Sequence, residues 1–198
     1  MPTLTNIAGP NGSGKSTLTA TEEFEGRANL VDPDAIARRI NQFAPAQVAA
    51  AAGREAIALW REYLASKTSF AVETTLAGKG TLALMREAKA QGFRIYLLYV
   101  ALSSPELQVD RVGLRVSQGG HDVPDEDVRR RYERSLAHAP EALLMADEAI
   151  VFDNSGYARK KLLAVRNGRV TWRAVRLPDW VRDIERAISR TQDRDRPT

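Results

Sequence analysis

A glycine-rich loop near the N-terminus constrains the fold of this chain more than any other feature. The segment Gly9-Pro10-Asn11-Gly12-Ser13-Gly14-Lys15-Ser16 has the spacing G-x-x-x-x-G-K-S, follows the apolar run Leu4–Ala8 and opens a helical pattern. Glycines let backbone N–H groups curl around a phosphate, and the helix that follows adds a favourable dipole for the anion. The motif therefore predicts a strand, a phosphate-binding loop and a helix, which is the first unit of a P-loop NTPase fold.

Strand and helix patterns alternate along the rest of the chain, which predicts an α/β fold. Helical patterns separate the further strands, which are expected at 29–32, 69–73, 93–102 and 149–153. We expect a three-layer fold with a mostly parallel sheet, helices on both faces and a C-terminal β-hairpin at Asn167-Gly168. The expected organisation is a single P-loop kinase domain over residues 1–190 with a disordered polar tail at 191–198.

Several helix boundaries can also be predicted. Asp34 is expected to cap a short helix that ends at Ile40, and one longer helix is expected over 45–67. Pro140 is expected to break or bend a helix that begins near 122–125, and a terminal helix is expected over 178–189.

Composition excludes several classes of protein. The chain has no cysteine, so disulfides, zinc–thiolate sites and thiol nucleophiles are excluded. It has no secretory signal pattern and no run of about 18 apolar residues, so we expect a cytoplasmic protein without a membrane partner. A net charge of +4 suits anionic small molecules but is too small for a distinct nucleic-acid tail, so we do not expect nucleic acid as a partner.

The loop residues have separate expected roles in binding ATP and Mg²⁺. Backbone groups from Gly9 to Thr17 are expected to surround the phosphates. Lys15 should reach the β- and γ-phosphates, and the Ser16 hydroxyl should bind Mg²⁺.

Two other classes of P-loop protein do not fit. An ABC-type ATPase needs a Leu-Ser-Gly-Gly signature and an apolar strand ending in Asp-Glu, whereas here Gln118-Gly119-Gly120 lacks the signature and Asn154 follows Asp153. A GTPase needs an Asn-Lys-x-Asp motif, which the sequence lacks. The remaining interpretation is a kinase that acts on a small molecule or a polynucleotide.

Carboxylates end two of the expected strands, at the sheet edge where ligands bind in α/β folds. Phosphoryl transfer to a hydroxyl uses a carboxylate to take or orient its proton, and Asp34 is the first candidate with Asp32 as the second. The structural alternative is that Asp34 caps the helix and Asp32 closes the turn before it. Glu73 could bind substrate hydroxyls or hold Mg²⁺ through water, or it could be a plain exposed strand end.

Basic residues from Arg111 to Arg134 flank Gly119-Gly120-His121 and favour a kinase lid, although arginines on helices often only face solvent. We expect two or three arginines of this stretch to be functional, from the set Arg111, Arg115, Arg129, Arg130, Arg131 and Arg134. His121 is expected to be a lid contact. Asn154 is a candidate contact for the nucleotide base, with a simple turn as the alternative.

Five segments in this order resemble the zeta toxin family, in particular its short bacterial branch. They are the glycine loop with Thr17, then Val31-Asp32-Pro33-Asp34, Glu73-Thr74-Thr75-Leu76, Gly119-Gly120-His121-Asp122-Val123-Pro124, and Phe152-Asp153-Asn154-Ser155. The resemblance runs from residue 3 to about residue 175.

The resemblance implies a toxin of a toxin–antitoxin pair that phosphorylates the 3′-hydroxyl of UDP-N-acetylglucosamine, with an antitoxin as a candidate partner. It implies that Asp34 is the catalytic base, that Glu73 and Thr75 hold the sugar, and that Arg111 binds phosphate. The longer toxins have a second arginine shortly before the position of Pro124, where this chain has His121. That role is expected to fall to Arg115 or to one of Arg129–Arg131, with Arg131 as the first candidate.

Two other functions stay open on the sequence. A polynucleotide 5′-hydroxyl kinase also uses a base aspartate and a basic lid, and would need aromatic stacking platforms in a basic groove. A non-catalytic module would use the nucleotide site only to regulate a partner.

Overall fold

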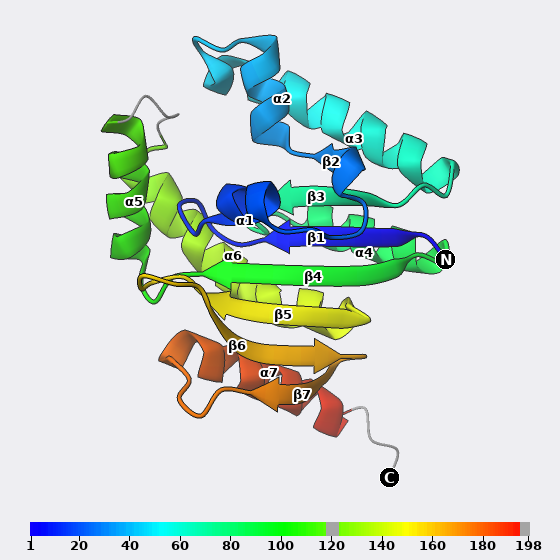
Figure 1. Cartoon of the computed structure of the whole chain (residues 1–198), viewed down its shortest axis with the longest axis vertical. Helices are drawn as coiled ribbons and strands as arrows, with labels where there is room; N and C mark the ends of the chain where they lie inside the picture. Colours follow the sequence, from blue (N-terminus) through cyan, green and yellow to red (C-terminus); the bar gives the residue numbers. More distant parts are fainter. Residues whose placement is uncertain (118–122, 195–198) are drawn as a thin grey trace.

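The computed structural model describes residues 1–117 and 123–194, and its centre is a seven-stranded sheet (Figure 1). The strand order is β2-β3-β1-β4-β5-β6-β7, and pairing is parallel from β2 to β5 and antiparallel from β5 to β7. The strands are β1 (Thr3–Ala8), β2 (Leu30–Val31), β3 (Phe70–Thr74), β4 (Arg94–Ala101), β5 (Glu148–Asp153), β6 (Lys160–Arg166) and β7 (Arg169–Arg173). The expected α/β fold with a mostly parallel sheet is therefore confirmed.

Seven α-helices connect or follow these strands in the described part of the chain. They are α1 (Lys15–Thr21), α2 (Pro33–Ile40), α3 (Ala49–Ala65), α4 (Gly80–Ala90), α5 (Pro105–Ser117), α6 (Asp125–Met145) and α7 (Asp179–Arg194). Short 3₁₀ turns precede β2 (η1, Arg27–Asn29) and α3 (η2, Pro45–Val48). Among the described residues, no helix is both long and apolar enough to span a membrane.

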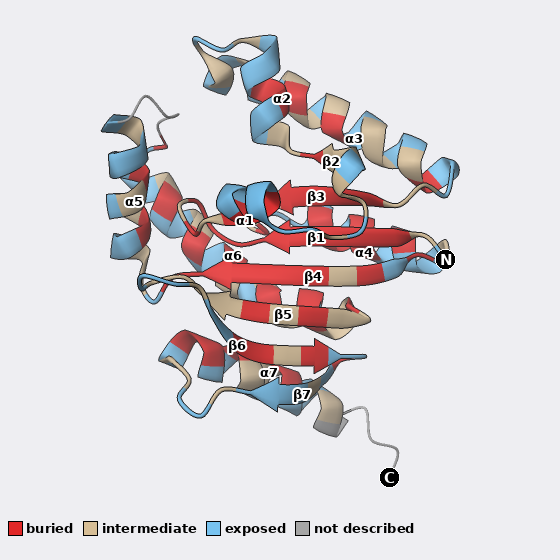
Figure 2. Cartoon of the chain, in the orientation of Figure 1, coloured by how far each residue is buried: buried red, intermediate tan, exposed pale blue. Residues whose placement is uncertain are grey.

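Helices cover the two faces of the sheet unequally. The main core lies on one face, where α3, α4, α6 and α7 pack on the strands through fully buried side chains such as Met85, Leu143 and Val181. On the other face, Leu18 of α1 packs against Ile7, Leu98 and neighbouring residues. Figure 2 shows that the central strands are buried, whereas β7 at the edge is mostly exposed.

The C-terminal hairpin follows from its turn sequence. Asn167 and Gly168 connect β6 to β7, and both have positive φ, 48° and 72°. A two-residue turn of this kind matches the twist of the two strands, and Asn-Gly accepts its left-handed backbone at low cost. The predicted hairpin is present.

Four expectations about helices differ from the structure. Asp32, not Asp34, caps α2, because the Asp32 side chain accepts a hydrogen bond from the Asp34 backbone N–H. The helix expected over 45–67 is a 3₁₀ turn followed by α3. Pro140 lies inside α6, which continues as one helix, so the expected break is absent. Helix α7 extends to Arg194, so the first residues of the expected 191–198 tail are helical, and 195–198 lie outside the described residues.

Candidate active site

The phosphate loop lies where β1 reaches α1, at the edge formed by the carboxyl ends of the parallel strands. Gly9 has a φ of 144°, and a Cβ at this position would lie 1.9 Å from the Val100 carbonyl oxygen of β4. Its N–H donates to the Thr74 carbonyl at the end of β3 (3.1 Å). Glycine at this position therefore lets the loop leave the sheet between two neighbouring strands.

Lys15 begins α1 and lies beneath the loop with only 7% of its surface exposed. Its Nζ donates a hydrogen bond to the Pro10 carbonyl at 3.0 Å. Burial lowers the pKa of Lys15, whereas the negative charges of Glu73, Asp34 and Asp32 oppose that shift. A buried ammonium group at a helix N-terminus is suited to an anionic ligand.

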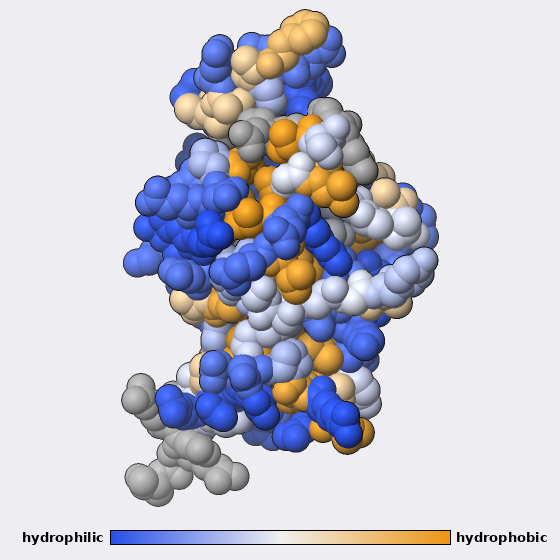
Figure 3. Space-filling view, turned by 90° about the vertical axis from the view of Figure 1, so that its left-hand side faces the viewer, coloured by the Kyte–Doolittle hydropathy of each residue, from blue (hydrophilic) through white to orange (hydrophobic). Residues whose placement is uncertain are grey.

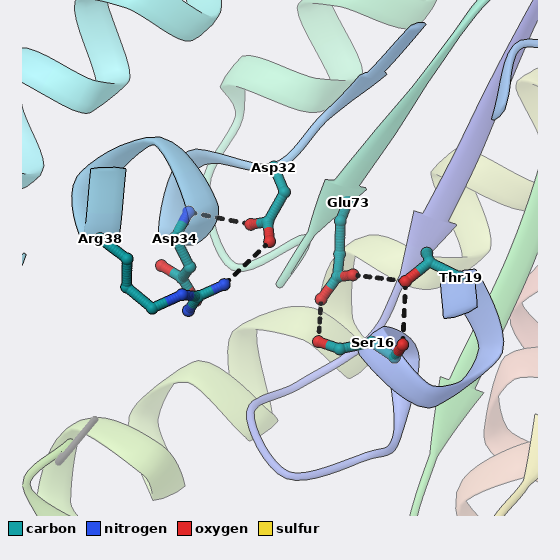
Figure 4. Close-up of polar contacts among 6 residues, drawn as sticks. All are labelled: Ser16, Thr19, Asp32, Asp34, Arg38 and Glu73. Atoms are coloured by element: carbon teal, nitrogen blue, oxygen red, sulfur yellow. Dashed lines mark hydrogen bonds and ion pairs between the residues drawn. The ribbon is translucent and has the colours of Figure 1, made fainter. Parts of the chain in front are cut away.

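Glu73, at the end of β3, points toward the first turn of α1 (Figure 4). Its Oε1 accepts from the Ser16 hydroxyl (2.9 Å), and its Oε2 accepts from the Thr19 hydroxyl (3.3 Å). Burial raises the pKa of Glu73, and the nearby Lys15 charge opposes the shift. The structure thus joins Glu73 to Ser16, the expected Mg²⁺ ligand, and adds Thr19, which the sequence reasoning missed although it lies one turn after Ser16.

Asp32 and Asp34 share the N-terminus of α2 but have different environments. Asp32 Oδ1 accepts from the Asp34 N–H at 2.9 Å, and Arg38 Nη2 lies 3.5 Å from Asp32 Oδ2. Burial and then the charge of Asp34 raise the pKa of Asp32. In Figure 4 the hydrogen bond drawn for Asp34 uses its backbone, not its carboxylate. Capping therefore accounts for Asp32 and leaves Asp34 without that structural explanation.

A cavity of about 360 Å³ opens over the phosphate loop. It brings together most of the residues predicted from the sequence, and its lining is Asn11, Gly12, Gly14, Lys15, Ser16, Thr17, Asp32, Asp34, Arg38, Glu73, Arg111, Leu114, Arg115 and Asn154. Figure 3 views this edge of the molecule, where hydrophobic side chains (orange) gather in the middle of the face between hydrophilic ones (blue). The volume falls within the range of small-molecule sites.

A second cavity of about 270 Å³ adjoins the first, because Asn11, Asp34 and Arg38 line both. Its other lining residues come from α2, η2, the first residue of α3, the segment just before α6 and the first part of α6. They are Pro33, Ala37, Pro45, Ala46, Ala49, Val123, Pro124, Asp127 and Arg131. The sequence reasoning missed Arg38 and Asp127. Arg38 lies four residues after Asp34, the spacing that puts two side chains on one helix face, so helical periodicity could have identified it.

The predicted lid residues have different positions. Arg111 and Arg115 of α5 line the first cavity, and Arg131 of α6 lines the second, with its Nη1 3.4 Å from Asn11 Oδ1. His121 lies outside the described residues. Thr75 lines neither cavity; its hydroxyl accepts a weak contact from the Ala77 N–H at 3.5 Å.

Asn154 contacts the protein in ways that the prediction of a base contact did not include. Its Nδ2 donates to the Ser13 carbonyl (2.9 Å), and its own carbonyl accepts from Arg111 Nη2 (2.7 Å). Asn154 therefore joins the loop after β5 to both the phosphate loop and α5.

Solved structures with the same fold include proteins of several kinds. The crystal structure of AvrRxo1-ORF1:-ORF2 with ATP matches with a TM-score of 0.71 and 16% sequence identity. The match covers 95% of this chain but only 64% of the AvrRxo1 chain. The PezAT chromosomal toxin–antitoxin system of Streptococcus pneumoniae matches with a TM-score of 0.62 and 13% identity over 98% and 87% of the two chains. A kinase candidate from Chloroflexus aurantiacus matches with a TM-score of 0.50 and 22% identity over 66% and 76%. At these identities the likeness shows the fold alone.

Two sequence matches are more specific. An uncharacterized protein of Haemophilus influenzae is 36% identical over 124 residues, which are 63% of this chain and 88% of the relative. The model of an AAA domain family, AAA_33, matches residues 4–139, from β1 through most of α6. This match includes the phosphate loop, Asp34, Glu73 and the arginines of α5. The chain therefore belongs to this AAA domain family and has a P-loop kinase-like domain.

Proposed function

We propose that the chain is an ATP-dependent kinase that transfers the γ-phosphoryl group to a hydroxyl group of a small acceptor. The observation that carries the proposal is the position of Asp34, which lines both the cavity over the phosphate loop and the adjoining cavity. An acceptor in the second cavity would have its hydroxyl next to Asp34 and in reach of the phosphate chain. Asp34 would take the proton of that hydroxyl as it attacks, in the role of general base.

The residues around Ser16 fit a bound Mg²⁺. The hydroxyls of Ser16 and Thr19 and the carboxylate of Glu73 are hard oxygen groups, the type of ligand that Mg²⁺ prefers. Among residues 1–117 and 123–194, no cluster of three or more His, Cys, Asp or Glu residues forms a metal site by itself. Mg²⁺ commonly binds through one or two carboxylates together with substrate phosphates and water, so these side chains would supply part of its ligands. When bound, the ion would neutralise charge that develops on the phosphates.

Arginines would supply the remaining positive charge. Arg111 and Arg115 line the phosphate cavity and would lie along the phosphate chain of ATP. Arg131 lines the acceptor cavity next to Asn11 and would contact the acceptor or the transferring group. Guanidinium groups match phosphate oxygens with two parallel hydrogen bonds, so they suit this role.

The proposed acceptor is a UDP-amino sugar such as UDP-N-acetylglucosamine, as the resemblance to zeta toxins implies. The acceptor cavity supports it with two arginines for phosphates and an apolar floor that includes Pro45, Ala46 and Val123. The resemblance also gives sugar contacts to Glu73 and Thr75. Glu73 lines the phosphate cavity and would meet a sugar that extends into it, whereas Thr75 lines neither cavity, so its sugar contact stays a prediction. The fold shared with PezAT, a toxin–antitoxin system, supports an antitoxin as a candidate partner.

The test is a transfer assay with Mg²⁺-ATP and a panel of acceptors: UDP-N-acetylglucosamine, other UDP-sugars, aminoglycosides and 5′-hydroxyl oligonucleotides. Mass spectrometry detects an acceptor that has gained one phosphate. Asp34→Asn is expected to lower kcat by about 10²–10⁴-fold, because general-base catalysis typically contributes that factor. ATP affinity should stay close to that of the unmodified protein.

The outcomes test the acceptor, the role of Asp34 and the kinase reaction separately. Phosphate on an oligonucleotide would replace the UDP-sugar by a polynucleotide acceptor. Full turnover in the Asp34→Asn variant would remove Asp34 from the mechanism. ATP binding without transfer to any acceptor would favour a regulatory module.

A further inference from the structure

Three elements that are far apart in the sequence meet at Asn154. Its backbone N–H donates to the Ala101 carbonyl at the end of β4 (3.0 Å), and its carbonyl accepts from Arg111 Nη2 of α5 (2.7 Å). Its side-chain Nδ2 donates to the Ser13 carbonyl of the phosphate loop (2.9 Å). The main-chain contacts fix the position of the residue, so its amide group is held against the loop.

This contact sets the orientation of one peptide group in the loop. In a trans peptide the C=O group and the following N–H group point in opposite directions, and no peptide bond among the described residues is cis. Because the Ser13 carbonyl points to Asn154, the Gly14 N–H points away from Asn154. Gly14 is the N-cap of α1 and lines the phosphate cavity, so its N–H belongs to the set of donors that binds anions at a helix N-terminus.

The Asn154 side chain approaches the backbone of Gly14 closely. The φ of Gly14 is 95°, and a Cβ at this position would lie 2.4 Å from Asn154 Nδ2. Glycine is thus needed both for the backbone angle and for the approach of the Asn154 amide.

We propose that Asn154 is a positioning residue for the phosphate chain of the nucleotide, acting through the Ser13–Gly14 peptide, and that it does not read the base. The inference rests on the proposed nucleotide site but not on the proposed acceptor. It predicts that every ligand with a triphosphate depends on Asn154 to the same degree, whatever base it carries.

The test measures the affinity of three probes, ATP, GTP and inorganic tripolyphosphate, each with Mg²⁺, by calorimetry on the full chain. Asn154→Ala is expected to weaken all three by the same factor, about tenfold, the size expected for one hydrogen bond that orients a binding group. Asn154→Asp should weaken them further, because a carboxylate would face the Ser13 carbonyl and repel the phosphates.

Asn29→Ala is the matched control. Asn29 Nδ2 also donates to a backbone carbonyl at 2.9 Å, that of Ser69, and the residue lines neither cavity. This variant should bind all three probes with unchanged affinity, although it loses the same kind of hydrogen bond. If Asn154→Ala does not fold, Asn154→Ser, whose side chain is too short to reach Ser13, takes its place with the same expected loss.

Two results would overturn the proposal. If the variant lost affinity for ATP but kept that for GTP and tripolyphosphate, Asn154 would read the base. Unchanged affinity for all three probes would show that the contact has no role in binding. Neither result depends on an acceptor, so both can be told apart from a failure of the proposed kinase reaction.

Discussion

At the scale of single residues, the site contains charged groups that are buried and close to one another. Burial lowers the pKa of Lys15 and raises those of Glu73 and Asp32. The two carboxylates therefore hold protons more tightly in the folded chain than in the unfolded one. Shifts of this kind are common at functional sites, because such sites sacrifice stability for chemistry.

Glu73→Gln should make the folded protein more stable at neutral pH. The pKa of Glu73 is raised in the folded state, so its contribution to the unfolding free energy is complete below the unfolded value of 4.5. That contribution is lost as pH rises through the folded pKa, whereas glutamine is neutral at every pH. Urea unfolding of both proteins should be measured from below pH 4.5 up to neutral pH. The unfolding free energy of the variant, relative to that of the unmodified protein, should rise as the pH rises.

Glu62→Gln, at an exposed position of α3, controls for the change in net charge. A constant difference between the Glu73→Gln protein and the unmodified one across pH would contradict the raised pKa. Transfer activity should fall in the same variant, because its amide is a poorer partner for Mg²⁺ than a carboxylate.

Single residues were predicted well from the sequence where one local motif determines them. The loop from Gly9 to Ser16 is such a case, because its glycine spacing, preceding strand and following helix agree. Asp32 and Asp34 were harder to separate, because residues two apart at a helix start compete for one capping role. Only the folded structure shows that Asp32 is the carboxylate that accepts the backbone N–H.

At the scale of elements, α2 links the phosphate cavity to the acceptor cavity. Its N-terminus carries Asp32 and Asp34, and Arg38 lies in its last turn. The helix depends on the Asp32 cap for its start, so the cap also determines where Asp34 lies.

Asp32→Ala should lower the unfolding free energy by about 1 kcal/mol relative to Asp32→Asn, the typical value of an N-cap. Asparagine keeps an oxygen that can accept from the Asp34 N–H, whereas alanine does not. Urea unfolding at pH 7 measures the difference between the two variants, and both lack the buried charge. Equal stability would mean that the cap does not hold the start of α2.

Elements were predicted correctly wherever apolar patterns and turn signals agreed, as at the β6–β7 hairpin. Errors occurred where tertiary packing overrides a local rule. Pro140 is tolerated inside α6, whose buried face includes Ala139, Ala142 and Leu143 on either side of it. The second cavity could not be predicted, because α2, α3 and α6 meet there only in the folded chain.

At the scale of the whole molecule, the sheet is covered unevenly. On the sheet face that α1 covers, some residues of β5 and β7 remain partly exposed to solvent. Cationic side chains lie over the aromatic rings of these two strands. Arg159 lies 5.2 Å from the Phe152 ring, and Lys161 lies 5.0 Å from that of Trp172. Long charged side chains of this kind shield apolar surface while they keep their charge in water.

The nucleotide cavity joins elements from most of the chain, so ligand binding should stabilise the molecule as one unit. Mg²⁺-ATP at 100 times its Kd is expected to add about 2.7 kcal/mol to the unfolding free energy. Thermal melts with increasing nucleotide should show a rising Tm. Lys15→Ala should remove most of this rise, and a rise of the same size in that variant would place the nucleotide elsewhere.

The order of the strands in the sheet also has a consequence for how the protein is made. Among the strands of this sheet β1 is synthesised first, but it lies between β3 and β4, so its pairing with β4 is not complete until residues near 101 have been synthesised. Asn154 follows Ser13 by 141 residues, a delay on the order of ten seconds at usual rates of translation. The nascent chain thus carries the complete sequence of the phosphate loop well before Asn154 exists to hold the Ser13 carbonyl, so the loop reaches its final form only late in synthesis.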